Sequence, residues 1–348
     1  MKVVVAAPAG PAEEYAALGD AGHEVVLGAP TAGPGTRIPD GELIELAQGA
    51  DCLICIAVPR TVIEALPQLA TIVGPAVGIE RVDLDAASEH GVLVCNSPSE
   101  ENVIGVSEAA IGLMLALAKR LKRKEARVRG GGWGVREDRG FLLWRQTVGI
   151  VGLGRTGSGV AKRLAGWDLT LLGVDPYVSD ERFAELGVRR VDLPTLLRES
   201  DFVTLHVVVT EETRKMIGRE QLGAMKAGAY LINTSRGDVV DQDALCRAID
   251  EESIAGAGLD VFDPEPLTLD SPLHGLDPER VILTPHNVAA TEASRTGNLR
   301  LAVENALMAM RGEVPETVKN PEVLPGWRGR ARWRGRAASQ PAERGAKR

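Results

Sequence analysis

The fold of this chain is indicated most clearly by residues Thr147-Val-Gly-Ile-Val-Gly-Leu-Gly-Arg-Thr-Gly157. Its first five residues form a short apolar run typical of a buried strand, and residues 158–164 continue as a helical pattern. Between them, Gly152, Gly154 and Gly157 permit a tight turn, close approach of a phosphate and close packing of helix on strand. This order of elements predicts a nucleotide-binding β-α-β unit.

The residues after this unit indicate which nucleotide binds. A second apolar run, 169–174, ends at Asp175, eighteen residues beyond Gly157. A carboxylate at this position accepts hydrogen bonds from ribose hydroxyls and repels the 2′-phosphate of NADP. Pro176 and Tyr177 follow and offer no arginine to hold that phosphate. The sequence therefore predicts NAD as the cofactor.

Strand and helix patterns alternate along most of the chain. Before residue 99, strand-like runs lie at 2–7, 23–28, 51–58, 71–74 and 92–95, with helical stretches near 11–19 and 41–49. A second alternating block runs from Thr147 to about Pro285, and a further helix is expected from about Thr291 to Met310. This rhythm predicts an α/β fold with two doubly wound parallel sheets, in which a Rossmann NAD domain is inserted into a flavodoxin-like domain.

A long helix is expected where the first block ends. Ser99 is a suitable N-cap, Glu100 and Glu101 occupy the first turn, and apolar residues recur at helical spacing as far as Leu121. We place the NAD domain at 99–286 and a substrate domain at 1–98 plus 287–320. Residues 321–348 carry eight Arg or Lys and two Glu, and their composition predicts a disordered basic tail.

Charge and composition exclude several classes of protein. The net charge is −8 and the tail contributes +6, so the remaining body carries −14 and is a poor nucleic-acid binder. The longest uninterrupted apolar run, 109–118, is half of what a bilayer requires, and no signal peptide is expected at the N-terminus. We therefore predict a cytoplasmic protein without a membrane partner.

The cysteines give no sign of a metal site. Cys52 and Cys55 form a C-x-x-C pair, but no second pair completes a zinc site. Residues three apart in a strand point to opposite faces of the sheet. We therefore predict buried, reduced thiols and no bound metal.

Three residues that suit 2-keto acid reduction each follow a different strand pattern of the NAD domain: Arg236, Glu265 and His286. Arg236 suits a substrate carboxylate, because its planar guanidinium binds such groups with two hydrogen bonds. His286 suits proton transfer to the carbonyl oxygen, and Glu265 suits orienting that imidazole and raising its pKa. Each residue alone is equally consistent with an exposed charge or a strand cap.

Four ordered motifs of the chain resemble the D-isomer-specific 2-hydroxyacid dehydrogenase family. They are Gly149–Gly157, Leu231-Ile-Asn-Thr-Ser-Arg-Gly-Asp238, Gly258-Leu-Asp-Val-Phe262 with Pro264-Glu-Pro266, and Thr284-Pro-His286. The resemblance covers about residues 1–320 and implies an Arg-Glu-His site at Arg236, Glu265 and His286. It also implies a homodimer built on the cofactor domain, with catalysis in a cleft between the two domains.

The resemblance further implies specific ligand contacts. For the cofactor these are Gly152, Gly154, Arg155, Thr156, Gly157, Asp175, Val207, Thr234, Ser235, Asp260 and Ala289. For the substrate they are Arg236 and the backbone at Val77 and Gly78. The substrate loop departs from the family pattern, because Glu80 and Arg81 replace an Asp-Asn pair, which leaves the identity of the acid open.

We expect interconversion of a small D-2-hydroxy acid and its 2-keto acid, such as 3-phosphoglycerate, glycerate, hydroxypyruvate or glyoxylate. Arg60 and Arg81 are candidates for binding a substrate phosphate, and they are equally consistent with exposed arginines that bind nothing. Formate is disfavoured, because formate dehydrogenases of the family have Gln at the position of Glu265. The alternative function is an NAD(H)-sensing binding protein or corepressor without turnover.

Overall fold

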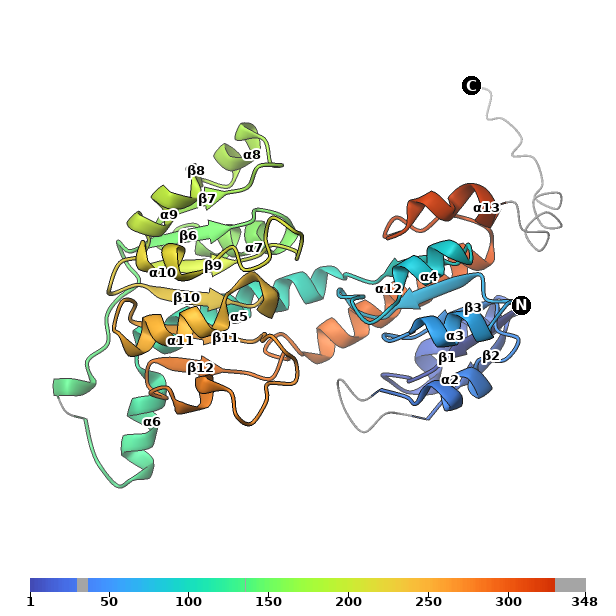
Figure 1. The fold of residues 1–348 in the computed structure, drawn as a ribbon, viewed down its shortest axis with the longest axis horizontal. Coiled ribbons are helices and arrows are strands. Elements are labelled where there is room, and N and C mark those ends of the chain that lie inside the picture. The colour runs from blue at the N-terminus through green and yellow to red at the C-terminus, as the bar shows by residue number, and fades with distance from the viewer. Residues whose placement is uncertain (30–36, 135, 329–348) are drawn as a thin grey trace. The chain divides into compact units, whose positions relative to one another are not determined.

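The computed structural model describes residues 1–29, 37–134 and 136–328. The chain forms two compact units, of which unit 1 comprises Met1–Asn102 and the segment from Thr291, and unit 2 comprises Val103–Ala290 (Figure 1). Each unit is built on one parallel β-sheet. The predicted fold class is thereby confirmed.

The sheet of unit 1 has the order β2-β1-β3-β4-β5, which is the flavodoxin-like arrangement. Its strands are β1 (Lys2–Val5), β2 (Glu24–Leu27), β3 (Cys52–Ile54), β4 (Thr71–Gly74) and β5 (Leu93–Asn96). Four of the five are rich in buried Val, Leu and Ile, because helices cover both faces of the sheet.

Alternate residues of these strands enter two separate apolar cores. On one face lie η1 (Ala12–Tyr15), α1 (Ala16–Asp20), α12 (Glu292–Met310) and α13 (Leu324–Arg328). On the other lie α2 (Asp40–Leu46), α3 (Arg60–Ala65) and α4 (Leu84–Glu89). Cys52 joins the first core and Cys55 the second, and both are free, buried thiols as predicted.

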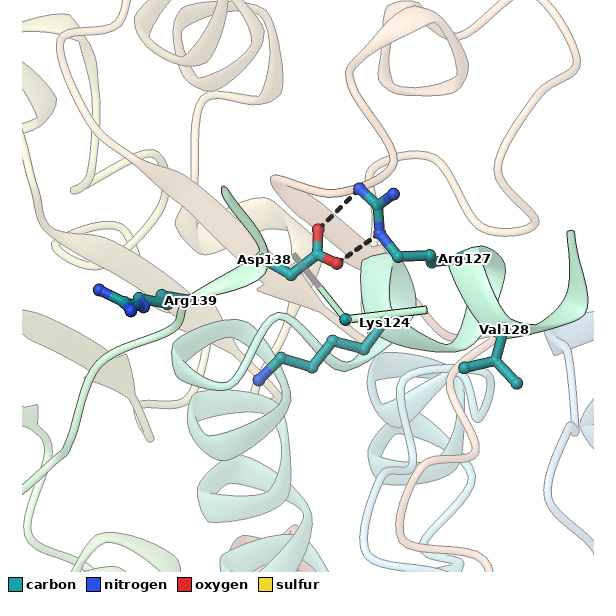
Figure 2. A pocket seen from close by; sticks show the side chains of 6 residues that line it. Lys124, Arg127, Val128, Asp138 and Arg139 are labelled. Atoms are coloured by element: carbon teal, nitrogen blue, oxygen red, sulfur yellow. Dashed lines mark hydrogen bonds and ion pairs between the residues drawn. The ribbon is translucent and has the colours of Figure 1, made fainter. Parts of the chain in front are cut away.

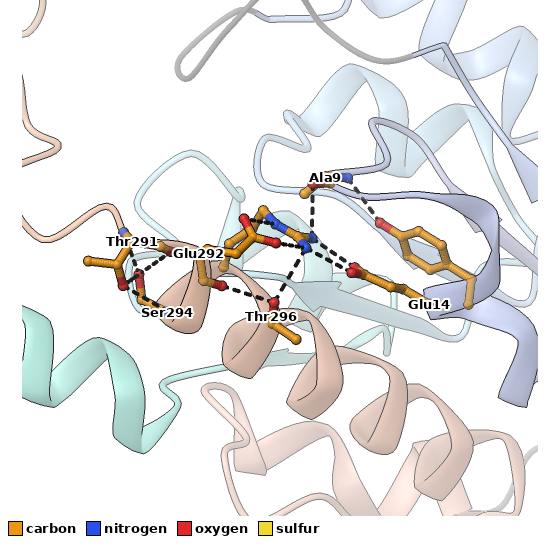
Figure 3. A network of polar contacts seen from close by, with 8 residues as sticks. Ala9, Glu14, Thr291, Glu292, Ser294 and Thr296 are labelled. Atoms are coloured by element: carbon orange, nitrogen blue, oxygen red, sulfur yellow. Dashed lines mark hydrogen bonds and ion pairs between the residues drawn. The ribbon is translucent and has the colours of Figure 1, made fainter.

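A polar network ties the start of α12 to the loop after β1 (Figure 3). Thr291 accepts a hydrogen bond from the backbone N–H of Ser294 and caps the helix. One turn later, the guanidinium of Arg295 makes two hydrogen bonds of 2.7 Å to the carboxylate of Glu14 and donates to the carbonyl of Ala9. The network fixes the loop at the carboxyl end of β1.

The prediction of a disordered tail was wrong for residues 321–328. Pro321–Val323 form the 3-10 helix η5, and α13 follows directly. The indole of Trp327 is fully buried and donates to the hydroxyl of Thr71, 3.3 Å away. The composition of residues 321–348 predicts disorder. Burial of the Trp327 ring nevertheless holds residues 321–328 in an ordered conformation. Residues 329–348 lie outside the described part of the chain.

The sheet of unit 2 has the order β12-β11-β10-β9-β6-β7-β8. Counted from β6, this is the Rossmann order 3-2-1-4-5-6 with one more strand. The strands are β6 (Thr147–Val151), β7 (Thr170–Val174), β8 (Arg189–Arg190), β9 (Phe202–Leu205), β10 (Tyr230–Asn233), β11 (Gly256–Leu259) and β12 (Val281–Leu283).

Helices cover both faces of this sheet as well. One face packs against α5 (Glu100–Ala118), α7 (Arg155–Leu164) and α8 (Asp180–Glu185). The other packs against α9 (Leu193–Glu199), α10 (Arg219–Gly223) and α11 (Gln242–Asp250). Short 3-10 turns are η2 (Arg136–Asp138), η3 (Gly237–Val239) and η4 (Pro272–Gly275).

The predicted long helix is interrupted at Arg120. α5 is capped as expected by Ser99, whose hydroxyl accepts from the N–H of Asn102, but it ends at Ala118. Arg120 adopts a left-handed conformation with φ of 51°, and α6 (Leu121–Arg129) begins after it. The carbonyl of Ala118 accepts from the N–H of Phe141, so a returning loop ends α5 where periodicity alone predicts continuation.

By length and composition, α5 is the one helix in the described ranges that could cross a bilayer. Buried core helices share both properties, and the buried side chains of α5, among them Ala110, Met114 and Leu117, join a core beneath the sheet of unit 2. The length and apolar composition of α5 are therefore explained by its packing in unit 2.

Candidate active site

The glycine-rich loop joins β6 to α7. Gly152 has a φ of +88°, and a Cβ added there would lie 2.6 Å from the carbonyl oxygen of His206. A Cβ at Gly157 would overlap the carbonyl of Gly152, so both positions require glycine. A Cβ at Gly154, the N-cap of α7, would meet nothing within 4 Å. The loop thus leaves open space at a helix N-terminus, where a pyrophosphate binds favourably.

Asp175 lies at the carboxyl end of β7, next to this loop. Its Oδ2 accepts a hydrogen bond of 2.8 Å from the backbone N–H of Leu153, and its Oδ1 accepts one of 2.9 Å from Tyr177. The carboxylate is therefore fixed against the glycine-rich loop and is only half buried. Its remaining lone pairs are available to ribose hydroxyls.

The other predicted cofactor contacts follow further strands of the same sheet. Arg155 and Thr156 open α7, and Ser107 of α5 donates to the carbonyl of Thr156 at 3.2 Å. Val207 follows β9, Thr234 and Ser235 follow β10, Asp260 follows β11 and Ala289 follows β12. Because the strands are parallel, their carboxyl ends share one edge of the sheet, which is where ligands bind in such folds.

Two polar groups at this edge fit a bound nucleotide. The hydroxyl of Thr234 is buried without a hydrogen-bond partner among the described residues, which suits a ligand atom as its partner. The ring of His206 contacts the hydroxyl of Thr204 at 2.9 Å, and burial lowers the pKa of His206 to about 4. His206 is thus neutral at pH 7 and adds no charge beside the glycine-rich loop. The open loop, Asp175 and Thr234 together fit a dinucleotide.

The turn after β10 presents Arg236. Its neighbours Thr234, Ser235 and Gly237 are buried, and Arg236 itself is half buried. One guanidinium nitrogen donates to the carbonyl of Ser235 at 2.7 Å. Arg236 is thus more exposed than the turn that carries it at the carboxyl edge of the sheet.

Glu265 and His286 form the central contact of the site. Nδ1 of His286 lies 2.7 Å from Oε2 of Glu265, and Oε1 of Glu265 accepts from the backbone N–H of Phe262 at 3.0 Å. His286 has a φ of +52°, a conformation uncommon for residues with a side chain. The surrounding contacts therefore determine the direction of its imidazole.

The charges of these residues act on one another. The hydrogen bond to Glu265 raises the pKa of His286, while burial and the charge of Arg236 oppose that rise. Burial alone would raise the pKa of Glu265, but the hydrogen bonds from His286 and Phe262 outweigh it and lower the pKa, with help from the charges of His286 and Arg236. The arrangement favours an imidazolium paired with a carboxylate, with Arg236 near enough to influence both.

Asp260 has a structural part in this site that the sequence did not reveal. Its carboxylate accepts from the Thr284 hydroxyl at 2.6 Å and from the backbone N–H groups of Asn287 and Val288 at 3.0 and 3.1 Å. These partners lie on both sides of His286, so Asp260 holds the loop that carries the imidazole. In the sequence, the one indication of this role was that Asp260 is an acidic residue directly after an apolar strand.

The two predicted substrate contacts, Val77 and Gly78, lie in unit 1, in the loop after β4. Asn96 Nδ2 donates to the carbonyl of Val77 at 2.5 Å, and the N–H of Ser97 donates to Ala76. The end of β5 thus supports this loop. The structure brings Arg236, Glu265 and His286 together in unit 2, and Val77 and Gly78 belong to the other unit.

Arg60, the candidate phosphate ligand, is already paired. Its guanidinium makes hydrogen bonds of 2.6 and 3.2 Å to the two carboxylate oxygens of Glu89, and Glu64 and Asp83 each lie 3.6 Å away. Arg81 also has an interaction partner. The charge of Arg60 is therefore balanced by acidic side chains of unit 1.

A surface pocket of about 230 Å³ lies elsewhere in unit 2, beside α6 (Figure 2). Arg127 of α6 forms an ion pair with Asp138 at its wall, and Lys124, Val128 and Arg139 complete much of the lining. The pocket contains none of the predicted site residues. Among the described residues, no group of three or more His, Cys, Asp or Glu side chains could hold a metal ion.

Comparison with known proteins gives a consistent result. Residues 111–288 match the model of the family described as D-isomer specific 2-hydroxyacid dehydrogenase, NAD binding domain. A glyoxylate reductase of Korarchaeum cryptofilum is 40% identical over 289 residues, covering 81% of this chain and 86% of the relative. A D-3-phosphoglycerate dehydrogenase of Methanocaldococcus jannaschii is 38% identical over 294 residues, covering 83% of this chain but only 55% of that longer protein.

Solved structures agree with the sequence comparison. An NAD-dependent formate dehydrogenase from Staphylococcus aureus in complex with NAD superimposes with a TM-score of 0.72 at 27% identity, covering 88% of this chain and 94% of that chain. Sequence motifs, strand order and whole-chain similarity therefore point to one family.

Proposed function

Because this chain belongs to the D-isomer-specific 2-hydroxyacid dehydrogenase family, we propose that it reduces a small 2-keto acid with NADH and oxidises the D-2-hydroxy acid in reverse. The chain is an NAD-dependent oxidoreductase, and its cofactor is NAD. The observation that carries the proposed reaction is the Glu265–His286 contact of 2.7 Å beside Arg236, next to a glycine-rich loop that fits a dinucleotide.

Each member of the trio has a separate task. The guanidinium of Arg236 binds the substrate carboxylate and draws electron density from the adjacent carbonyl. The imidazolium of His286 donates its proton to the carbonyl oxygen, and in the reverse direction the neutral ring removes that proton from the alcohol. Glu265 accepts from Nδ1 of His286, so that Nε2 is the nitrogen left to face the substrate. Bound NADH supplies the hydride.

The cofactor is held by the residues at the carboxyl edge of the unit 2 sheet. Backbone N–H groups at Arg155 and Thr156 bind the pyrophosphate beside Gly152, Gly154 and Gly157. Asp175 binds the ribose and selects NAD over NADP. The remaining contacts are Val207, Thr234, Ser235, Asp260 and Ala289.

The substrate is a small acid without a phosphate group, with glyoxylate and hydroxypyruvate as the leading candidates. The ion pairs of Arg60 with Glu89, Glu64 and Asp83 support this choice over 3-phosphoglycerate, because a phosphate would compete with three carboxylates for that cation. The backbone at Val77 and Gly78 binds the substrate carboxylate. One relative of similar length is itself named a glyoxylate reductase.

The enzyme acts as a homodimer in the cytoplasm. Trp133, Leu142 and Trp144, in the segment between α6 and β6, are 83%, 60% and 48% exposed, and α6 buries none of its own residues. Large apolar side chains exposed along one segment are typical of subunit interfaces. Light scattering should give twice the mass of the chain, and a monomeric mass would contradict this part of the proposal.

A panel of 2-keto acids tests the proposed reaction. Glyoxylate, hydroxypyruvate, pyruvate and 3-phosphohydroxypyruvate are each mixed with the enzyme and NADH, and NADH oxidation is followed by absorbance. We expect turnover with the first two to exceed that with the phosphorylated acid. Tight NADH binding without turnover of any acid would instead favour the NAD(H)-sensing alternative.

A further inference from the structure

The turn that presents Arg236 is organised by one side chain, that of Asn233. Asn233 is the last residue of β10 and is 1% exposed. Its Oδ1 accepts from the backbone N–H of Ser235 at 3.0 Å and from the Ser235 hydroxyl at 2.8 Å, while its Nδ2 donates to the carbonyl of Arg236 at 2.9 Å. A single buried amide therefore bridges both residues that precede Gly237.

The partners fix the orientation of this amide. A backbone N–H only donates and a backbone carbonyl only accepts, so Oδ1 must face Ser235 and Nδ2 must face Arg236. The Arg236 carbonyl also accepts a longer hydrogen bond, of 3.4 Å, from the N–H of Val239. Asn233 is thus a closer donor to this carbonyl than Val239 is.

The far end of the turn is fixed against the segment that carries Glu265. A Cβ added at Gly237 would overlap the backbone carbonyl of Phe262. The N–H of Phe262 in turn donates to Oε1 of Glu265. The backbone on either side of Arg236 is therefore anchored, by Asn233 before it and by the Gly237–Phe262 contact after it, and the second anchor leads directly to the Glu265–His286 pair.

We propose that Asn233 is a positioning residue for the reaction, which aligns the guanidinium of Arg236 with the Glu265–His286 pair through the Arg236 carbonyl. The inference rests on the proposed function, since it assigns a task only if Arg236 binds the substrate carboxylate. Asn233 itself touches no substrate atom. Its effect on turnover therefore depends on the presence of an arginine at 236.

Asn233→Asp tests this with minimal change in size. The aspartate keeps an acceptor for Ser235 but turns a carboxylate oxygen toward the Arg236 carbonyl, so the donated hydrogen bond is lost and the carbonyl is repelled. We expect KM for glyoxylate to rise on the order of 10- to 100-fold, with a smaller fall in kcat, because a misplacement of about 1 Å has effects of this size. Asn233→Ser, which is too short to reach the carbonyl, provides a second variant should the first fold poorly.

Asn320→Asp is a matched control in unit 1. The Asn320 side chain accepts from the N–H of Val94 at 2.8 Å and donates to the carbonyl of Val92 at 2.9 Å, so the substitution removes the same kind of buried hydrogen bond. We expect it to lower the thermal unfolding temperature as Asn233→Asp does while KM stays unchanged. A shared rise in KM would mean that loss of stability alone explains the effect.

A double-mutant cycle with Arg236→Ala separates positioning from a merely structural role. If Asn233 acts through the guanidinium of Arg236, Asn233→Asp should change kcat/KM by less than about twofold in the Arg236→Ala background, where no cation remains to be aligned. Full additivity of the two substitutions, or an unchanged KM in Asn233→Asp, would overturn the inference while leaving the proposed function intact. Failure of the unsubstituted enzyme to reduce any 2-keto acid would overturn the proposed function itself, and the inference with it.

Discussion

Nδ1 of His286 lies 2.7 Å from Oε2 of Glu265, although the two residues follow different strands of the unit 2 sheet. The imidazole is half exposed, with 47% of its side-chain surface accessible, while the carboxylate is more enclosed at 28%. One ring nitrogen is thus occupied by a carboxylate and the other is left to solvent or substrate. A hydrogen-bonded carboxylate stabilises the imidazolium, which is the form that donates a proton.

Glu265→Gln should move the pH profile of keto-acid reduction. The hydrogen bond to Glu265 raises the pKa of His286, so the imidazolium persists to higher pH and is lost as pH rises through that raised pKa. Without the carboxylate the pKa falls, and kcat/KM for reduction should decline from a lower pH. Initial rates across pH 5–9 test this. An alkaline limb at the same pH in both enzymes would contradict the assigned role of Glu265.

Two substitutions of Asp260 should have different effects. All three short hydrogen bonds to the loop around His286 end on Oδ1, so Asp260→Asn can keep them while Asp260→Ala removes them. We expect the Ala variant to lose kcat on the order of tenfold or more, since unpaired donors release the loop. The Asn variant should keep most of its turnover and show a lower pKa for His286, because the charge of Asp260 helps to raise that pKa. Equal losses in both variants would show that charge, and not the loop contacts, is what matters.

Asp175→Asn should weaken the discrimination against NADPH. The asparagine oxygen can still accept from the N–H of Leu153 and so keep the glycine-rich loop in place, while the negative charge near the 2′-phosphate disappears. We expect NADPH to bind on the order of tenfold more tightly than to the unsubstituted enzyme, a change of about 1.4 kcal/mol. Fluorescence titration with NADH and NADPH measures both affinities. Tighter binding of NADPH than NADH before any substitution would contradict the role of Asp175.

Trp327→Ala should destabilise unit 1. The indole is fully buried in the core formed by α12 and the sheet, and its loss leaves a large cavity and an unpaired Thr71 hydroxyl. Truncation of a buried aromatic residue costs about 3–5 kcal/mol in free energy of unfolding. Calorimetry should show a lowered transition for unit 1, and Trp327→Phe, which keeps most of the volume, should show a smaller shift. An unchanged transition in the Ala variant would mean that residues 321–328 do not stabilise the fold.

Much of the fold could be predicted from local sequence. The apolar runs that end at Val5, Gly74 and Val174 are strands because they are short, apolar and bounded by turn residues. The start of α12 near Thr291 was also predicted, from apolar residues that recur at helical spacing. The break at Arg120 was not, because it depends on a hydrogen bond from Phe141 to Ala118 that periodicity does not encode.

The site could also be predicted in part from local sequence. Arg236, Glu265 and His286 were identified from their motifs, and the structure places Glu265 and His286 in contact. The supporting contacts of Asn233 and Asp260 depend on which backbone groups lie within about 3 Å in the folded chain, and no spacing rule supplies that. The pairing of Arg60 with Glu89 joins α3 to the end of α4, so the sequence alone did not show that this arginine is already paired.

Single-turnover oxidation of NADH by glyoxylate tests the role of the trio most directly. The unsubstituted enzyme, Arg236→Ala and His286→Ala are each loaded with NADH, whose binding is verified by fluorescence, and then mixed with the acid. We expect rapid oxidation by the first and a loss on the order of 100-fold or more in each variant, since both groups stabilise charge at the same oxygen. Rapid oxidation by either variant would contradict a mechanism in which the guanidinium and the imidazolium act together on the keto acid.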